Sequence, residues 1–382
     1  MKNLTTYYII SLIKGEKRSH ILTTVIKKAL YNNRTVDILV NDGVIVDILP
    51  HSDTFAPEGA EIHNIEGKDV FPGLLDIHAH GCLSFDTTEG NGRKEMCLHL
   101  AKSGTTSWLP TTMTASRSVL TRAVNELDFP QNGCDIVGFH LEGPFVSPSA
   151  AGAQDPDVIR LPDLDEFRTY KNVKMITVAP ELEGAMEFIE KCGVSVALGH
   201  TACSYDTACR AFDMGANCLT HTFNAMPPLH HRNPGPIGAA IDKNAYVQVI
   251  TDGFHLHGSV VKMLYRTFGP DRMIIISDSV APAGLSDGEY IINSRPIIVK
   301  SSHAFLPDGT IAGSSSTLMD CVRTAISFGI PKSDALRMAS ETPANCIGVN
   351  KGRIAVGYDA DIIVVDDDLN VLSSFVKGRL IK

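Results

Sequence analysis

Eight short apolar runs, rich in β-branched residues, follow one another along the chain after Phe71. The runs are GLLDIHA, TTSWLPT, CDIVGFHLE, VKMITVAP, VSVALGHT, NCLTHTFN, YVQVITDG and RMIIISDS. Most are continuously apolar, which is typical of strands buried on both faces of a parallel sheet. The segments between them have helical character. SYDTACRAFDMGA, for example, has a serine N-cap, helical spacing of apolar residues and a glycine near its end.

Eight strands that alternate with helices predict an α/β fold of the (β/α)8 TIM-like barrel type. A doubly wound open sheet is the competing arrangement, but it would not explain the residues at the strand ends. Outside this block, RTVDILVNDGVIVDILP places Asn-Asp-Gly between two alternating runs and predicts a hairpin. The C-terminal segment has the same texture. We therefore expect residues 1–70 and 346–382 to form one small β-sandwich domain and residues 71–345 to form the barrel.

Composition limits the class of partner and the compartment. The 382 residues are 44% hydrophobic and carry a formal net charge of -9. This balance argues against a broad nucleic-acid surface, although a few local cations could bind an anionic small molecule. The nine cysteines form no CxxC pair, which indicates reduced thiols in a cytoplasmic protein. No apolar run approaches the roughly 18 residues of a membrane span, and the N-terminal YYIISLI is more typical of a strand than of a signal peptide.

Imidazole and carboxylate side chains recur where the predicted strands end. In (β/α)8 enzymes the chemistry lies at the C-terminal ends of the strands. The residues at those ends are His78 and His80 on the first strand, Glu142 on the third, His200 on the fifth, His221 on the sixth, Asp252 and His255 on the seventh, and Asp278 on the eighth. These side chains are ligand types of Zn²⁺, Fe²⁺ and Mn²⁺. A lone HxH pattern means little, but the complete set predicts a divalent-metal site.

His78 and His80 are two residues apart, so on a strand both side chains point to the same face. We expect that face to be the mouth of the barrel, together with Glu142. Asp76 lies on the same side and is a candidate hydrogen-bond partner for the site. His140 shares the face of Glu142, but we expect it mainly to pack.

Seven motifs then follow one another in order: FPGLLDIHAHG, HLEGPF, LGHTACS, LTHTFNAMPPLHHRNPG, TDGFH, SDSVAPAG and IAGSSSTL. With the closing GRIAVGYDADIIVVD, this series closely resembles the N-acetylglucosamine-6-phosphate deacetylase family of the amidohydrolase superfamily. HTFNAM and HLEGP are specific to that family, whereas the HxH and GxDAD patterns are shared more widely. Only the N-terminal segment matches nothing in the family.

The resemblance implies a metal-dependent hydrolase that releases acetate from a phosphorylated amino sugar. In it, Glu142, His200 and His221 would bind the main metal ion. Asp278 would be the acid/base residue, and His255 would bind the substrate near its amide carbonyl. The other residues implied to contact the substrate are Ala153, Gln154, Asn224, Ala225, Arg232, Ile311, Ala312 and Gly313.

The phosphate and the metal count are also implied by the resemblance. The backbone at Asn224 and Ala225 and the guanidinium of Arg232 would meet the phosphate. In family members this arginine comes from the neighbouring subunit, which implies a homodimer or larger homo-oligomer. Some members lack the HxH pair and use one metal. Because this chain has His78 and His80, one or two divalent ions are implied, with Zn²⁺ first and Fe²⁺, Mn²⁺ or Co²⁺ as alternatives.

Three related functions stay open at this point. An N-acetylgalactosamine-6-phosphate deacetylase would act on an epimer that differs in one hydroxyl, and no residue excludes it. A cyclic-amide hydrolase would have no use for the arginine loop NAMPPLHHRNPG. A non-catalytic scaffold typically loses its metal ligands, whereas this chain keeps all of them and Asp278 as well.

Overall fold

The computed structural model describes residues 23–381, except 56, 126–129, 131, 293–294, 301–302 and 310. At 291, 292, 295, 311 and 312 it describes the backbone alone. The expected strand YYIISLI lies outside the described residues. The chain divides into two compact units, one that ends at Gly73 and resumes over Arg353–Lys382, and one that comprises Leu74–Gly352. Each is described by itself.

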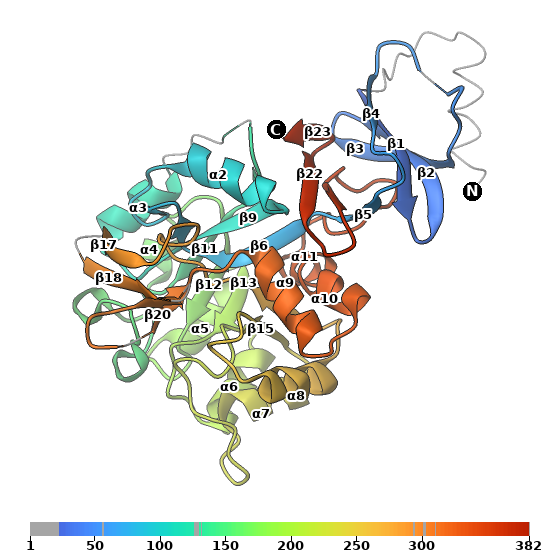
Figure 1. Ribbon diagram of the computed structural model, residues 1–382. Helices are drawn as coiled ribbons and strands as arrows, with labels where there is room; N and C mark the ends of the chain where they lie inside the picture. Colours follow the sequence, from blue (N-terminus) through green and yellow to red (C-terminus); the bar gives the residue numbers. More distant parts are fainter. Residues whose placement is uncertain are drawn as a thin grey trace. The chain divides into compact units, whose positions relative to one another are not determined.

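The larger unit is built on eight parallel strands (Figure 1). In order around the sheet these are β6 (Leu74–Ala79), β9 (Thr105–Thr112), β11 (Phe139–Glu142), β12 (Val173–Val178), β13 (Ser195–Leu198), β14 (Cys218–Leu219), β15 (Tyr246–Ile250) and β16 (Met273–Ile276). A short strand, β10 (Asp135–Ile136), begins the third run and also pairs with β9. Each predicted run therefore contains a strand.

Backbone hydrogen bonds join the last strand of this sheet to the first. The N–H of Asp278 donates to the carbonyl of His78 at 2.9 Å, and the N–H of His80 donates to the carbonyl of Ser279 at 2.7 Å. The sheet is thus nearly closed, which confirms the (β/α)8 barrel and excludes the doubly wound open sheet. Closure also brings the ends of all eight strands to one rim.

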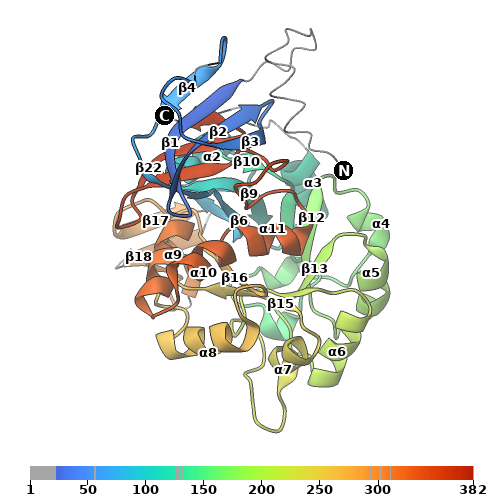
Figure 2. The same ribbon diagram turned by 90° about the vertical axis from the view of Figure 1, so that its right-hand side faces the viewer.

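Most helices of this unit lie between successive barrel strands, and the last three follow the final strand of the unit. They are α2 (Arg93–Lys102), α3 (Arg117–Asn125), α4 (Leu164–Phe167), α5 (Ala185–Lys191), α6 (Tyr205–Asp213), α7 (Gly235–Asp242), α8 (Gly258–Phe268), α9 (Leu318–Ser327), α10 (Lys332–Met338) and α11 (Glu341–Ile347). Figure 2 shows α5 to α8 outside the strands that they connect. At the start of α6, the predicted N-cap Ser204 accepts a hydrogen bond from the backbone of Thr207 at 3.2 Å.

A four-stranded antiparallel sheet follows the last barrel strand, and the sequence pattern did not predict it. Its strands are β17 (Gly288–Ile292), β18 (Arg295–Lys300), β19 (His303–Phe305) and β20 (Ile311–Ser314). The end of β20 returns to the barrel, because the N–H of Ser314 donates to the carbonyl of Asp278 at 2.9 Å. This sheet therefore places Gly313 beside the end of the eighth barrel strand. A separate pair of two-residue strands, β7 (Gly81–Cys82) and β8 (Phe85–Asp86), follows His80.

The smaller unit is one eight-stranded sheet made from both chain segments. Its strands are β1 (Thr24–Tyr31), β2 (Arg34–Asn41), β3 (Val44–Pro50), β4 (Glu61–Asn64), β5 (Asp69–Pro72), β21 (Ile362–Val365), β22 (Val371–Val376) and β23 (Arg379–Ile381). The predicted hairpin joins β2 to β3 through Asp42 and Gly43, which both have positive φ as a two-residue hairpin turn requires. β5 pairs antiparallel with β21, so the two ends meet as expected.

The strands of both units bury apolar side chains from distant parts of the chain. Ile38 of β2 and Phe375 of β22 belong to one buried cluster in the small unit. In the barrel, Leu75 of β6 and Ile274 of β16 share a cluster with Ile347 of α11. No helix among the described residues is both long enough and apolar enough to cross a membrane.

We expect Leu75→Ala to destabilise the barrel strongly. Leu75 is 1% exposed, and such a truncation in a packed core typically costs about 2–5 kcal/mol. Leu161 is 52% exposed, so Leu161→Ala is the matched control and should change stability by less than about 0.5 kcal/mol. Urea unfolding followed by circular dichroism measures both. Equal midpoints for the two variants would contradict the assignment of Leu75 to the core.

Candidate functional site

The ends of the barrel strands surround a cavity of about 220 Å³. Predicted site residues that line it are His80, Glu142, Ala153, Gln154, His200, His221, Asn224, Ala225, His255, Asp278 and Gly313. Met113 and Gly152 also line it and were not predicted. His78 lies directly behind this lining. The structure therefore brings together most of the residues that the sequence singled out.

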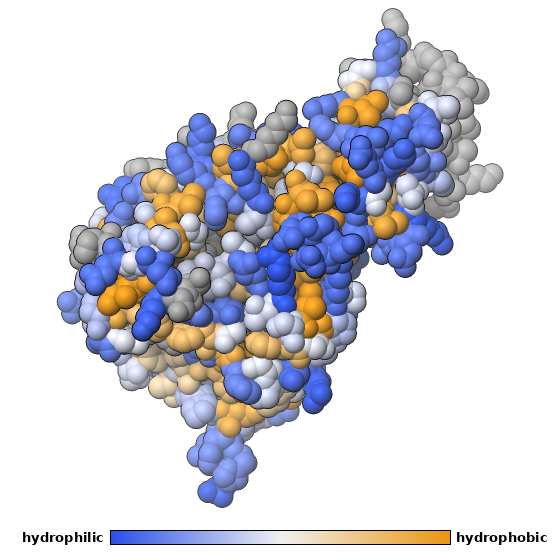
Figure 3. Space-filling model, viewed as in Figure 1, coloured by the Kyte–Doolittle hydropathy of each residue, from blue (hydrophilic) through white to orange (hydrophobic). Residues whose placement is uncertain are grey.

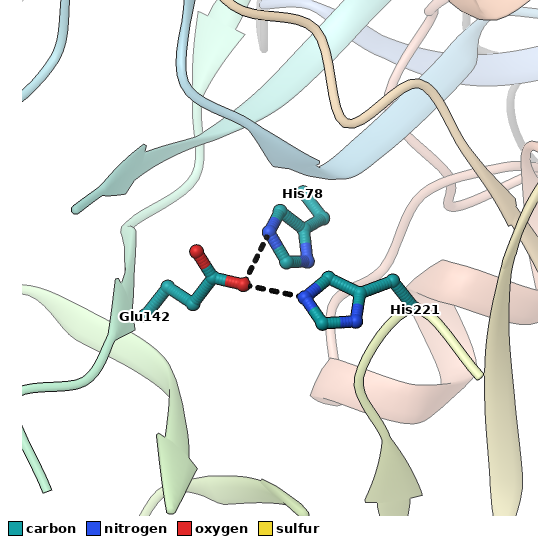
Figure 4. A group of neighbouring side chains, drawn as sticks. All are labelled: His78, Glu142 and His221. Atoms are coloured by element: carbon teal, nitrogen blue, oxygen red, sulfur yellow. Dashed lines mark hydrogen bonds and ion pairs between the residues drawn. The ribbon is translucent and has the colours of Figure 1, made fainter. Parts of the chain in front are cut away.

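The carboxylate of Glu142 lies at the centre of the site. Its Oε1 is 2.8 Å from Nε2 of His221 and 3.1 Å from Nε2 of His200. The same oxygen is 3.3 Å from Nε2 of His78, while Oε2 is 3.3 Å from Nε2 of His80. Figure 4 shows His78 and His221 both directed at Glu142. Four imidazoles from three strand ends thus approach one buried carboxylate.

Asp278 completes the group on the side of the first strand. Its Oδ1 is 3.3 Å from Nε2 of His80 and 3.5 Å from Nε2 of His78. Two sets of ligand atoms lie within 4.8 Å of one another: His78 with Glu142 and His221, and His78 with His80 and Asp278. The residues of both sets are buried.

These side chains fit a divalent cation. Nε2 of His78 is buried and makes no hydrogen bond within the part of the chain that the structure describes. Nε2 of His200 and Nε2 of His221 are 3.1 Å apart and share Oε1 of Glu142. At most one of these two nitrogens can donate to the other, and a cation between them and the carboxylate would satisfy both. Imidazole nitrogen and carboxylate oxygen are the donors that Zn²⁺ and similar ions take.

The imidazoles also control the charge of the carboxylates. Burial raises the pKa of Asp278, but the charges of His78 and His80 more than offset it, and the pKa falls to about 2. For Glu142, burial is again opposed by neighbouring imidazoles, chiefly those of His200 and His78, and the pKa lies well below its usual value. Both groups therefore carry negative charge near neutral pH.

Three of these side chains are turned into the site by unusual backbone conformations. His200, His221 and Asp278 have φ of 45°, 21° and 48°, in or near the left-handed region. Such conformations cost on the order of 1–3 kcal/mol each and gather at functional sites. Each lies two residues past the end of a barrel strand, where the chain must turn from the sheet into a loop. Backbone strain therefore occurs at the positions where these side chains converge on the site.

His255 reaches the cavity from the loop after β15, held by Asp252. Oδ2 of Asp252 is 2.7 Å from Nδ1 of His255, and Oδ1 accepts the backbone N–H groups of Phe254 and His255 at 2.9 Å. Burial lowers the pKa of His255, but the hydrogen bond and charge of Asp252 raise it by more, so the pKa lies above its ordinary value. A ring protonated on both nitrogens would present its Nε2–H to the cavity.

Ala153 and Gln154 come from the loop after the 3₁₀ helix η1 (Pro148–Ala150). Gln154 is buried, its Nε2 donates to Oε2 of Glu142 at 2.5 Å, and its Oε1 accepts from the N–H of Thr114 at 2.7 Å. Its amide thus supports Glu142 while facing the cavity. The neighbouring Gly152 has positive φ, and a Cβ there would lie 3.4 Å from the ring of His200.

The expected phosphate contacts differ in their placement. Asn224 and Ala225 line the cavity, but the N–H of Asn224 already donates to the carbonyl of His221 at 2.9 Å. This bond belongs to the tight turn after His221, and the contact of this backbone with a phosphate stays a prediction. Arg232 is exposed and lies outside the cavity lining. It belongs to the loop before α7, the yellow-green projection of Figure 1, whose surface in Figure 3 is mainly hydrophilic.

Gly313 reaches the cavity from β20, where its φ is 112°. A Cβ at this position would lie 2.5 Å from a methyl group of Val280 and 3.1 Å from the carbonyl of Asp278, so the close approach requires glycine. Ile311 and Ala312 belong to the same strand, but their side chains are outside the described part of the structure.

Asp76 and His140 were the two residues expected near the site without a direct role, and their contacts differ. Asp76 contacts the backbone N–H of His78 at 3.2 Å and the hydroxyl of Ser277, and it does not reach the ring of His78. Burial raises the pKa of Asp76 to about 6. His140 is fully buried and its ring bonds the carbonyl of Ile77 and the hydroxyl of Thr177, so it packs inside the barrel as expected.

Sequence reasoning missed two partners of the site. Gln248 contacts Nδ1 of His78 at 2.9 Å, and its only signal was a single polar residue in the apolar run YVQVI. Asp252 was recognised as a strand-end carboxylate, but its pairing with His255 was not. The sequence signal for this pairing was that Asp252 and His255 are three positions apart, because a tight turn can bring such residues into contact.

Comparisons with known proteins show the family of this chain. The model of the Amidohydrolase family matches residues 70–381. An N-acetylglucosamine-6-phosphate deacetylase of Lysinibacillus sphaericus is 33% identical over 365 residues, which cover 90% of this chain and 93% of that protein. An N-acetylgalactosamine-6-phosphate deacetylase of Escherichia coli O157:H7 is 31% identical over 359 residues, with 89% and 93% covered.

A solved structure is similar over nearly the whole chain. It is a mutant N-acetyl-D-glucosamine-6-phosphate deacetylase from Mycobacterium smegmatis in complex with N-acetyl-D-glucosamine-6-phosphate. Its TM-score is 0.84 at 30% identity, with 95% of this chain and 99% of that chain covered. The resemblance inferred from the motifs is thus confirmed. The chain belongs to the amidohydrolase family, in the group that contains the N-acetylglucosamine-6-phosphate deacetylases.

Proposed function

We propose that this enzyme hydrolyses the N-acetyl group of N-acetylglucosamine-6-phosphate to glucosamine-6-phosphate and acetate. The observation that carries the proposal is the convergence of four imidazoles and two carboxylates at one site. The chain is also similar over about nine tenths of its length to relatives that bear this name. Both point to hydrolysis of an amide rather than to a scaffold, because the ligand set is complete.

The proposal assigns the metal to two positions. Glu142, His200 and His221 would bind the main ion, and His78 and His80 would bind a second ion next to Glu142. Zn²⁺ is the first choice, and Fe²⁺, Mn²⁺ or Co²⁺ suit the same donors. A divalent ion bound there polarises the amide carbonyl and makes a neighbouring water more acidic.

Asp278 is proposed as the acid/base residue. Its carboxylate is charged at neutral pH, since its pKa is about 2, and it lies at the edge of the cavity. Oδ1 or Oδ2 can accept the proton of the attacking water. The same oxygen can then deliver that proton to the amine nitrogen, which would otherwise be a poor leaving group.

His255 is proposed to bind the amide carbonyl. When both ring nitrogens carry a proton, Nδ1–H bonds Asp252 and Nε2–H can donate to the carbonyl oxygen. This oxygen gains negative charge as water attacks, so the hydrogen bond strengthens in the transition state. A donor of this kind typically contributes on the order of 3 kcal/mol.

The phosphate is proposed to meet Arg232 of a neighbouring copy in a homodimer or larger homo-oligomer. Arg232 does not line the cavity of its own chain and lies in an exposed loop. A guanidinium offers a fork of donors that suits phosphate oxygens. The nine cysteines are all free thiols, which supports a cytoplasmic location.

The galacto epimer is the second candidate substrate. A relative that is 31% identical over 89% of this chain is named an N-acetylgalactosamine-6-phosphate deacetylase. The residues proposed to act on the amide and the phosphate would serve either sugar. The choice between epimers must therefore be measured.

We expect purified enzyme with its metals counted to release acetate from N-acetylglucosamine-6-phosphate. The unphosphorylated sugar should react much more slowly, because it lacks the group that Arg232 binds. The galacto epimer is assayed beside it. Faster release from that epimer would transfer the assignment to the second candidate, and no acetate from any sugar by the metal-loaded enzyme would refute the proposal.

Asp278→Asn should lower kcat at least 100-fold, because general acid–base groups usually contribute 10²–10⁴. The ion at Glu142, His200 and His221 should stay bound. Steady-state kinetics with metal analysis by mass spectrometry test this. A variant with more than about a tenth of the wild-type kcat would remove Asp278 from the acid/base role.

Asp252→Asn should shift the basic limb of the pH profile of kcat/KM to lower pH. The charge of Asp252 raises the pKa of His255, so the protonated donor is lost at a lower pH once that charge is removed. Asp165→Asn makes the same chemical change at a carboxylate that is 89% exposed, and it should leave the limb in place. An unmoved limb in Asp252→Asn would show that His255 is not the group that titrates.

Arg232→Ala should raise KM for the phosphorylated sugar with little change in kcat. The origin of the arginine is tested by refolding Arg232→Ala together with Asp278→Asn. If Arg232 acts in the neighbouring site, mixed oligomers contain some sites with both groups intact, and at substrate concentrations well below the KM of Arg232→Ala the mixture gains activity over either variant alone. No gain in proven mixed oligomers would mean that Arg232 serves its own chain.

A further inference from the structure

Gln248 lies in the middle of β15, in the otherwise apolar sequence YVQVI. Its side chain has 0% exposure. A primary amide in the interior of a barrel is unfavourable unless its oxygen and nitrogen both find partners. The identity of those partners therefore indicates what the residue does.

The two ends of the Gln248 amide face different neighbours. Nε2 is 3.3 Å from Sδ of Met175, and a thioether can only accept a hydrogen bond. Oε1 is 2.9 Å from Nδ1 of His78. Because an amide oxygen can only accept, Nδ1 of His78 must carry a proton in this contact. This holds whether the ring is neutral or charged.

A proton on Nδ1 decides what the other ring nitrogen of His78 offers to the site. In the neutral ring, Nε2 then carries the lone pair. Nε2 is 3.3 Å from Oε1 of Glu142 and 3.5 Å from Oδ1 of Asp278. A lone pair directed at two carboxylates is repulsive unless a cation lies among them. Gln248 thus selects the tautomer of His78 that binds a cation.

His78 differs in this respect from the other histidine of the HxH pair. Nδ1 of His80 is buried and makes no hydrogen bond to any residue that the structure describes. His78 is also the one residue common to both sets of ligand atoms at the site. The orientation of His78 therefore affects either position that an ion could take.

We propose that Gln248 is a positioning residue for metal binding, which holds the proton of His78 on Nδ1 and presents Nε2 as a ligand. The proposal rests on the metal site of the proposed function. Hydrogen bonds of this kind behind a ligating histidine typically change metal affinity 10–100-fold when they are removed.

The test measures metal binding to the full-length enzyme after its metals have been removed, by calorimetric titration with Zn²⁺ alone. Gln248→Leu removes the acceptor at nearly constant volume, and we expect the weakest-bound ion to bind 10–100-fold more weakly. Gln248→Glu keeps an oxygen acceptor and should bind that ion at least as tightly as the wild type. The melting temperature of each metal-free variant reports whether the barrel is intact.

Thr177→Val is the matched control. It removes a buried hydrogen bond to His140, a barrel histidine that is not among the proposed ligands. It should leave every ion bound with wild-type affinity. If Gln248→Leu folds and binds every ion with wild-type affinity, the proposal is overturned. If Gln248→Leu does not fold, a folded Gln248→Glu that loses affinity for the ion overturns it instead. Acetate release is read separately, so a failure of the proposed substrate would not alter this result.

Discussion

The buried carboxylate of Glu142 is the group on which the rest of the site depends. It is 2% exposed, and a charge so removed from water must be compensated by its surroundings. The four imidazoles of His78, His80, His200 and His221 supply that compensation within 3.3 Å. Because those histidines lie on three different strand ends, Glu142 can be stabilised only when the barrel has closed. The geometry of the site therefore forms only together with the closed sheet.

A layer of buried polar groups lies beneath the site and holds it in place. Gln248 contacts the ring of His78, and Asp76 accepts its backbone N–H. His140 joins the carbonyl of Ile77 to the hydroxyl of Thr177. A barrel interior of this kind is more costly to assemble than an apolar one, because each group must find its partner. In return, the ring of His78 cannot rotate freely.

The small unit shows the same dependence on distant parts of the chain. Its central contact is the pairing of β5 with β21, which joins Val70 to Val364 across almost the whole sequence. The cluster that includes Ile38, Val364 and Phe375 is completed only when both segments are present. In the sequence, the barrel segment Leu74–Gly352 is therefore an insertion between the two halves of this sheet.

The amino-acid sequence by itself determined the eight barrel strands, the hairpin at Asp42 and Gly43, and the set of His, Glu and Asp residues at the strand ends. These features follow from local patterns, since burial on both faces selects continuous apolar runs and parallel strands bring their ends to one rim. The antiparallel sheet β17–β20 was missed because its strands are only three to six residues long, too short to establish a clear period in the sequence. Only the tertiary structure decided which nitrogen of His78 faces Glu142 and that Asp252 holds His255. It also decided that the N–H of Asn224 bonds within its own turn and that Arg232 lies outside the cavity. Those outcomes depend on distances between side chains from different strands and loops, such as the 2.9 Å from His78 to a glutamine 170 residues away, and no local pattern carries that information.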